Sequence, residues 1–185
     1  QSKVLSRMEK DMENLKKIFR VTSYSREDAV NYAVKYALVP NKNYIYFGVH
    51  QRIGGDCTSF VSQCLHAGGI PYSFDKKNPW WYNGKNKEIC SLSWSVAHSL
   101  YWYLIRNGEK NMHGVKGAEI NNAQDLNRGD LIFYENKRGL IFHSVIVTGF
   151  RASMPLVSQH SMEALNVSYI KPYYVPKIHF VKVFV

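Results

Sequence analysis

Apolar residues in the first half of the chain recur every three or four positions, a spacing that predicts amphipathic helices. One such helix begins after Ser25, which has Asp28 three positions later in a capping arrangement, and it ends before Pro40. A further helix is predicted over residues 94–105. The first helix, over residues 5–19, carries its apolar stripe on Leu5, Met8, Met12, Leu15 and Phe19.

A third helix is predicted over residues 57–67. Asp56 is a favoured residue at a helix start, and we expect its carboxylate to cap this helix. Gly68 and Gly69 end the helix. Its inward face carries Cys57, Val61, Cys64 and Leu65.

After residue 127 the period changes to two, or the chain becomes continuously apolar, and both patterns are typical of strands. Helices followed by consecutive short strands indicate an α+β fold with an antiparallel sheet. The predicted strands cover residues 131–134, 140–148, 156–160, 167–170 and 178–185.

The length of 185 residues, with 45% hydrophobic residues, predicts one domain over residues 21–185, preceded by a helical extension over residues 1–20. No apolar run reaches the roughly 18 residues that a membrane-spanning helix needs. The net charge of +10 favours an anionic partner such as nucleic acid, an acidic lipid surface or an anionic wall polymer. The charges are scattered and no nucleic-acid motif is visible, which argues against nucleic acid.

Three cysteines cannot all pair within one chain, so at least one thiol stays free. Cys57 is the candidate nucleophile because a helix N-terminus stabilises a thiolate. Cys64 is predicted to be a small buried hydrophobic residue, and Cys90 carries no strong signal.

His143 lies within an apolar predicted strand, where a polar ring needs a partner. A helix start packed on that strand can bring Cys57 within reach of the imidazole and form a nucleophile and base pair. Either residue has a simpler interpretation, as a structural cysteine or a hydrogen-bonded core histidine.

A third group is needed to orient the ring of His143. A hairpin that turns at residues 151–153 pairs His143 with His160 on the same face, while Gln159 points the other way. Asn166 is an alternative amide in a following loop.

Several motifs resemble those of known cysteine hydrolases. GDCTSFV at residues 55–61, GDLIFY at 129–134 and HSVIVTG at 143–149 look like the order and spacing of the NlpC/P60-type papain-like enzymes. The longer block GGDCTSFVSQCLHAGG at residues 54–69, with the dipeptides at 32–33, 40–41 and 93–94, resembles the putative amidase domain of clostridia and bacilli. The match runs from about residue 24 to about residue 168.

This resemblance implies a papain-like fold with N-terminal helices packed on an antiparallel sheet. It implies Cys57 as nucleophile, His143 as general base and His160 as the best match for the orienting residue. Members of the wider family cut amide bonds, commonly in the stem peptides of bacterial cell walls, so we expect a peptidoglycan or other peptide substrate, an extracytoplasmic or wall-associated location, and neither cofactor nor metal. Gln51 has the spacing of the papain oxyanion glutamine, although a lone loop glutamine is more often a surface residue.

Two other functions are consistent with the sequence. Trp80, Trp81 and Tyr82 lie in a predicted loop over residues 71–90, where they either anchor the loop to the core or bind cell-wall glycopeptide without turnover. Cys57, His143 and His160 are also of the residue types that bind zinc, although the usual close pair of ligands is missing.

Overall fold

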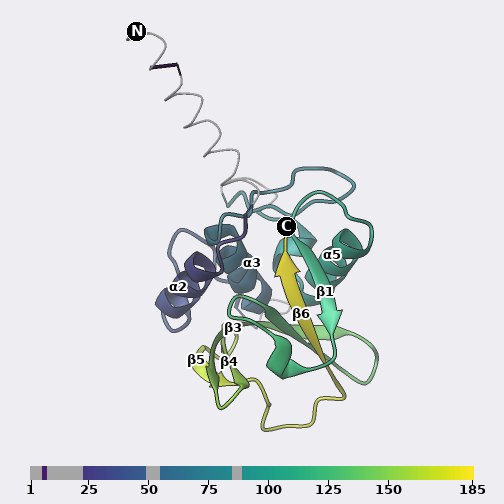
Figure 1. The fold of residues 1–185 in the computed structure, drawn as a ribbon. Coiled ribbons are helices and arrows are strands. Elements are labelled where there is room, and N and C mark those ends of the chain that lie inside the picture. Colours follow the sequence, from purple (N-terminus) through teal and green to yellow (C-terminus); the bar gives the residue numbers. More distant parts are fainter. Residues whose placement is uncertain (1–5, 8–22, 49–54, 85–88) are drawn as a thin grey trace.

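Helices on one side of an antiparallel sheet make up the architecture of the chain, as Figure 1 shows. The computed structural model describes residues 6–7, 23–48, 55–84 and 89–185. Apart from residues 6 and 7, the helix predicted over residues 5–19 lies outside the described residues, and so does Gln51. The elements are α2 (Arg26–Tyr36), α3 (Cys57–Ala67), α4 (Leu92–Ser95), α5 (Ala97–Glu109), β1 (Lys116–Ile120), the short 3-10 helix η1 (Ala123–Asp125), β2 (Leu131–Glu135), β3 (Ile141–Arg151), β4 (Met154–Gln159), β5 (Ala164–Ser168) and β6 (Lys177–Phe184).

The helices α2 and α3 begin where the sequence predicts. The side chain of Ser25 accepts a hydrogen bond from the backbone N–H of Asp28 at 3.2 Å, which caps α2 as expected. The bounds of α3 are those predicted, and its last turn is closed by the N–H of Gly68, which donates to the carbonyl of Cys64 at 2.9 Å. None of the described helices is long and apolar enough to cross a membrane.

The helix predicted over residues 94–105 consists of two pieces. Val96 adopts an extended conformation with φ of −117° and ψ of 122°, so α4 ends there and α5 starts at the next residue. Further along, α5 approaches β1 closely: a Cβ atom added at Gly108 would lie 2.2 Å from the carbonyl oxygen of Gly117. Only glycine permits this approach.

The six strands pair in the order β1-β6-β2-β3-β4-β5, and every neighbouring pair is antiparallel. The α+β class with an antiparallel sheet is therefore confirmed. The sequence pattern did not predict β1, because Gly117 and Glu119 interrupt its apolar alternation. All five predicted strands match within three residues at each end, and β5 begins three residues earlier than expected.

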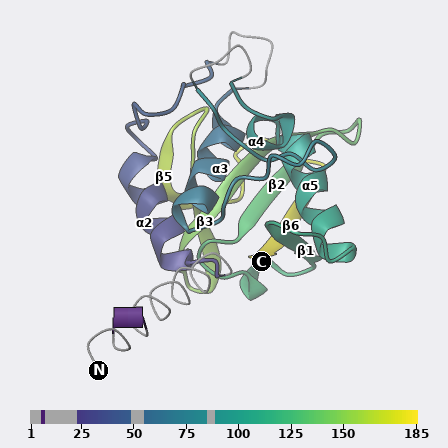
Figure 2. The same ribbon diagram turned by 90° about the horizontal axis from the view of Figure 1, so that it is seen from above.

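The sheet buries both of its faces. One face packs under the helices, which Figure 2 shows gathered over it, and its core includes Phe60, Leu65, Trp94, Leu104, Phe133 and Ile146. The other face has a smaller apolar cluster that includes Ala123, Leu126, Tyr134, Val145, Val147 and Val157. Adjacent residues of β3 therefore point to different sides of the sheet, and so do the side chains of His143 and Ser144.

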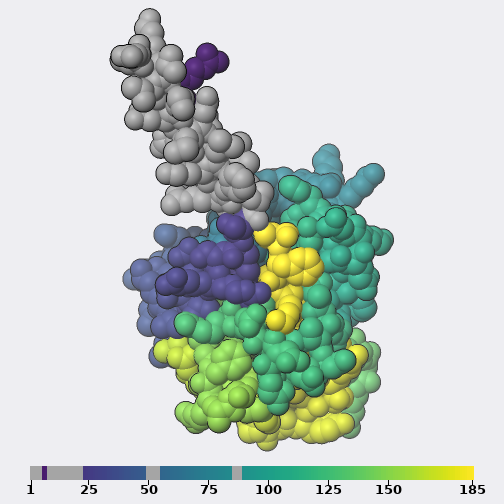
Figure 3. All heavy atoms as spheres, viewed as in Figure 1, coloured from purple at the N-terminus to yellow at the C-terminus, as the bar shows by residue number. Residues whose placement is uncertain are grey.

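The start of α2 is fastened to the end of β6. Arg26 donates to Asp130 Oδ1 at 2.6 Å and to the carbonyl of Val183 at 2.7 Å, while the N–H of Val183 donates to the same Oδ1 at 2.9 Å. In Figure 3 the yellow end of β6 accordingly lies against the purple start of α2. The carboxylate of Asp130 is fully buried, so this junction depends on all of its donors.

Candidate functional site

Cys57 is the first residue of α3, and its side chain is buried with 2% of its surface exposed. The sulfur lies 3.6 Å from Thr58 Oγ1. All three cysteines are free, and burial raises the pKa values of Cys64 and Cys90 above their ordinary range. Cys57 alone of the three stands at the N-terminus of a helix, where the backbone N–H groups favour a negative charge.

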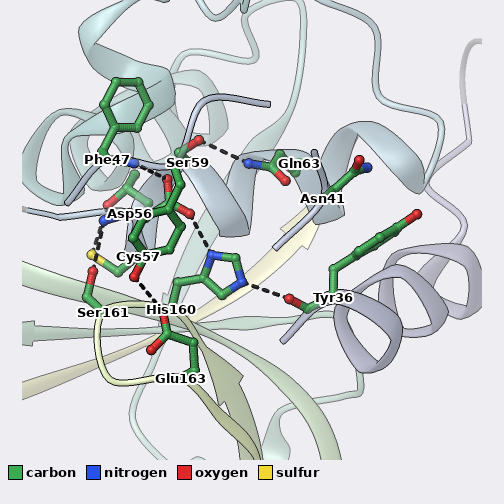
Figure 4. Close-up of polar contacts among 12 residues, drawn as sticks. Tyr36, Asn41, Phe47, Asp56, Cys57, Ser59, Gln63, His160, Ser161 and Glu163 are labelled. Atoms are coloured by element: carbon green, nitrogen blue, oxygen red, sulfur yellow. Dashed lines mark hydrogen bonds and ion pairs between the residues drawn. The ribbon is translucent and has the colours of Figure 1, made fainter. Parts of the chain in front are cut away.

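The carboxylate of Asp56 does not cap α3, contrary to the sequence-based expectation. Its Oδ1 accepts from the N–H of Phe47 at 3.1 Å, and its Oδ2 lies 2.5 Å from His160 Nδ1. Figure 4 shows the two side chains facing each other beneath the start of the helix. Because its carboxylate binds Phe47 and His160, Asp56 is held in place directly before Cys57. The carboxylate does not occupy the N–H groups at the start of α3.

His143 lies on β3 opposite Tyr134 of β2, and it is 7% exposed. Its Nε2 is 3.1 Å from Gln159 Oε1. The amide of Gln159 has a fixed orientation, since its Nε2 donates to the carbonyl of Met162 at 2.8 Å. An amide oxygen only accepts, so His143 Nε2 carries the proton and Nδ1 presents a lone pair.

Burial lowers the pKa of His143 to about 4, with a smaller lowering by the charge of Lys171 and an opposing effect of the Gln159 hydrogen bond. A neutral imidazole with a free lone pair is the form that accepts a proton from a thiol. The ring is therefore a base at neutral pH, held in one tautomer by Gln159.

His160 does not orient His143, and the sequence-based pairing of these two residues is wrong. The observed pair Ile146↔Ser158 continues to Ser144 opposite His160, so His160 shares the face of Ser144. Its Nε2 is 2.8 Å from the carbonyl oxygen of Tyr36, and its ring stacks on Phe60 with centroids 4.0 Å apart.

Gln159 is the residue that sequence analysis placed on the wrong face. The strand β3 has an irregularity between Val147 and Gly149, which shifts the register by one residue relative to a regular hairpin. The alternative Asn166 is also elsewhere, because its side chain oxygen accepts from Thr148 Oγ1 at 2.7 Å.

The turn between β4 and β5 joins the histidine side of the site to the start of α3. Ser161 and Met162 both have positive φ, at 59° and 80°, a backbone conformation that residues other than glycine rarely adopt. Ser161 Oγ accepts from the N–H of Asp56 at 2.8 Å, as Figure 4 shows, while the carbonyl of Met162 holds Gln159. Tyr46 adds a hydrogen bond to Glu163 at the far end of the turn. Surrounding contacts thus maintain a strained turn beside the thiol.

The helix that begins at Cys57 and the strand that carries His143 are in contact through the next residue of each. Thr58 Oγ1 and Ser144 Oγ are 3.0 Å apart, and each belongs to the residue that follows a candidate site residue. Among the described residues, no hydrogen bond joins the sulfur of Cys57 to the ring of His143 directly. The start of α3 therefore lies beside the middle of β3. Ser144 is directed toward the helix, whereas the ring of His143 lies on the other face of the strand, beside Tyr134.

Lys171 is a member of this region that sequence analysis did not find. Its Nζ donates to Gln159 Oε1 at 2.5 Å and lies 4.7 Å from the centre of the Tyr134 ring. Burial lowers the pKa of Lys171 to about 8, and the negative charge of Cys57 opposes that shift. A single lysine in an aromatic loop carries no sequence signal for such a position.

The tryptophans of the loop over residues 71–90 divide between two roles. Trp80 is fully buried and donates to Ser62 Oγ at 3.2 Å, so it anchors the loop to the core. Trp81 borders a cavity of about 580 Å³ between this loop and α5. The other residues around the cavity include Lys77, Pro79, Leu92, His98, Trp102 and Arg106.

Across the described ranges, no three His, Cys, Asp or Glu side chains are grouped so that they could hold a metal ion. The zinc alternative therefore has no ligand cluster in this part of the chain. Cys57 and His160 are instead engaged with Thr58 and Asp56.

Comparison with known proteins identifies the relatives of this chain. The family model described as "Putative amidase domain" matches residues 23–181. The chain is 31% identical over 149 residues to "Uncharacterized protein YhbB" of Bacillus subtilis (strain 168), covering 78% of this chain and 44% of that protein. It is 38% identical over 157 residues to "Uncharacterized protein YjcM" of the same organism, covering 80% of this chain and 33% of that protein. The chain thus spans less than half the length of these relatives, and no solved structure matches it.

Proposed function

We propose that this chain, which belongs to the family described as "Putative amidase domain", hydrolyses amide bonds with Cys57 as a covalent nucleophile. Membership of the family indicates amide hydrolysis in general terms. One observation supports the cysteine mechanism above the others: the helix that begins with the thiol contacts, through Thr58 and Ser144, the strand of a neutral histidine whose tautomer is fixed by Gln159.

In the first half of the reaction, His143 Nδ1 takes the proton of the Cys57 thiol while the sulfur attacks the amide carbonyl carbon. The tetrahedral intermediate carries a negative oxygen, which the backbone N–H of Cys57 at the helix start can stabilise. The carbon–nitrogen bond then breaks, and His143 gives its proton to the leaving amine. An acyl thioester on Cys57 remains.

In the second half, His143 is neutral again and takes a proton from a water molecule, whose oxygen attacks the thioester. The carbon–sulfur bond breaks, the acid product leaves, and the proton returns to the sulfur. Gln159 keeps Nδ1 directed toward the reaction in both halves because it binds only the Nε2 proton. We accordingly assign the orienting role to Gln159 in place of His160.

The same arrangement supports a papain-like fold of the NlpC/P60 type. A helix with the nucleophile at its first residue packs on an antiparallel sheet, and successive strands of that sheet carry the base and the orienting amide. This order along the chain is cysteine, histidine and then amide.

The proposed substrate is a peptidoglycan stem peptide or muramoyl-peptide amide, and the proposed location is extracytoplasmic or associated with the cell wall. The net charge of +10 supports this assignment, since the envelope polymers of bacteria are anionic. It also supports contact with an anionic wall polymer.

The test is digestion of purified cell walls, with mass spectrometry of the released fragments. New amine and carboxyl termini identify the bond that is cut. We expect Cys57→Ser to lower the release of fragments by at least about 10³-fold, because a serine hydroxyl lacks the acidity of the thiol. Cys90→Ser, which replaces a half-buried cysteine outside the site, is the matched control and should keep the activity. Undiminished hydrolysis by Cys57→Ser would exclude the covalent cysteine mechanism.

A second candidate function is binding of cell-wall material without turnover, and the cavity beside Trp81 favours it. Trp102, also at this cavity, is 45% exposed, and both rings can stack against a ligand. If Trp81→Ala weakens binding to intact walls while the wild-type chain releases no fragments from any wall preparation, binding is the function. Fragment release that depends on Cys57 decides for the hydrolase.

A further inference from the structure

Lys171 has an unusual setting for a lysine in this chain. Its ammonium group is half-buried between the ring of Tyr134, at 4.7 Å, and the amide oxygen of Gln159, at 2.5 Å. In the described part of the chain, the ion pairs involve Arg26, His160 and His179, and none involves Lys171. A positive charge is thus held at partial burial without a carboxylate, which costs free energy unless another negative group is present.

The contacts of Lys171 lead to both halves of the proposed site. Gln159 Oε1 accepts from Lys171 and from His143 at once, so the lysine fixes the oxygen that orients the imidazole. Two residues further along, Ser161 accepts from the N–H of Asp56, directly before Cys57. The segment over residues 159–161 therefore connects the ammonium group to His143 and to the start of α3.

Tyr134 and His143 are two titratable groups near the ammonium. Tyr134 is neutral at physiological pH because burial raises its pKa, and its OH donates to the carbonyl of Tyr169 at 2.7 Å. His143 is neutral as well, for the reason given above. A negative charge on Cys57 raises the pKa of Lys171, so a thiolate there favours the charged ammonium group.

We propose that Lys171 is a positioning residue of the amidase site: its ammonium group locks Gln159 against His143 and supplies the positive charge that favours the thiolate of Cys57. This inference rests on the proposed function of Cys57 as a nucleophile. A fixed cation beside the site also opposes protonation of His143, so the imidazolium formed during the reaction is a stronger acid toward the leaving amine.

The experiment measures the acidity of the Cys57 thiol without any substrate. Iodoacetamide is uncharged and reacts with the thiolate, so its rate of reaction with Cys57 against pH gives the thiol pKa. Lys171→Met keeps the length of the side chain and removes its charge and donors. We expect this change to raise the thiol pKa by about one unit, which lowers the rate at pH 6 about tenfold.

Two further variants separate charge from shape. Lys171→Arg retains a cation and should keep the alkylation rate within about twofold of wild type. Lys171→Gln retains a donor for Gln159 without charge and should behave like Lys171→Met toward iodoacetamide. Lys76→Met, which removes an exposed lysine, is the matched surface control and should leave the rate unchanged.

A second measurement is the titration of the His143 ring protons by nuclear magnetic resonance. Because the charge of Lys171 lowers the pKa of His143, Lys171→Met should raise that pKa, whereas a merely structural role would leave it in place in a folded variant. Should Lys171→Met fail to fold, wild type and Lys171→Arg decide the matter between pH 7 and pH 10. The lysine, with its pKa of about 8, loses its charge there, and the arginine does not.

Unchanged titrations of Cys57 and His143 in Lys171→Met would overturn the proposal, and so would equal behaviour of the Met and Arg variants. These readouts are independent of turnover. If Cys57→Ser retains hydrolysis, the proposed function is wrong, while the thiol titration still decides whether Lys171 tunes this cysteine.

Discussion

The burial of His143 makes the stability of the fold depend on pH. In the unfolded chain the imidazole has its ordinary pKa of 6.5, whereas burial in the folded chain lowers the pKa to about 4. The unfolded state therefore binds a proton as the pH falls below 6.5, and the folded state binds one only near pH 4. Folding loses stability across this interval and is unaffected by His143 above it.

The size of the effect follows from the two pKa values. A difference of ~2.5 pKa units corresponds to ~3.4 kcal/mol once both states are protonated, since each unit is about 1.36 kcal/mol. Between pH 7 and pH 5 the linkage relation gives ~1.8 kcal/mol, because the unfolded state is then mostly protonated and the folded state is not.

Urea denaturation at pH 7 and pH 5, followed by tryptophan fluorescence, measures this loss. Other groups also titrate in this range, so the comparison is with His143→Asn, which keeps an amide donor but has no titrating ring. We expect the variant to lose ~1.8 kcal/mol less than wild type on going from pH 7 to pH 5. The exposed His113→Asn is the control and should follow wild type. Parallel losses in wild type and His143→Asn would refute the conclusion that His143 is buried in its neutral form.

Three further changes test the site and the packing around it. Gln159→Leu should lower kcat about 10- to 100-fold, because His143 loses the partner that fixes its tautomer, and an unchanged kcat would exclude the orienting role. Gly108→Ala should destabilise the fold by at least ~2 kcal/mol in urea denaturation, because the new Cβ meets the carbonyl oxygen of Gly117 at 2.2 Å; a neutral effect would mean that α5 and β1 are further apart. Asp130→Ala should cost ~3 to 5 kcal/mol in the same assay, since it leaves buried donors without a partner, and a cost below ~1 kcal/mol would contradict the described junction.

Local signals predicted the bounds of α3 to the residue. The two glycines at its end act on neighbouring backbone, so their effect is visible in the sequence, whereas the carboxylate of Asp56 marks the start without capping the helix. The same holds for α2, whose cap is formed by Ser25 and Asp28 three residues apart. The break at Val96 has no such marker, and the pattern of apolar residues continues across it.

The position of Gln159 beside His143 was missed for a geometric reason. Side chains of a strand alternate between faces, so an error of one residue in the pairing of β3 with β4 exchanges His160 for Gln159. The irregularity between Val147 and Gly149 introduces that shift, and nothing in the local sequence marks it. Lys171 was missed because its partners are tertiary: Gln159 is 12 residues away and Tyr134 lies on another strand.

The two histidines predicted to act together are distinguished by what binds their second nitrogen. His143 binds Gln159 through Nε2 only, which leaves Nδ1 available to accept a proton. His160 has both nitrogens engaged, by Asp56 and by the carbonyl of Tyr36, and it cannot serve as a base without breaking one of these contacts. Its contribution is to hold Asp56, the residue directly before Cys57. The placement of Cys57 thus depends on His160, which is 104 residues away from Asp56 in the sequence. The sequence could place His160 near the site, but the contact that defines its role is tertiary.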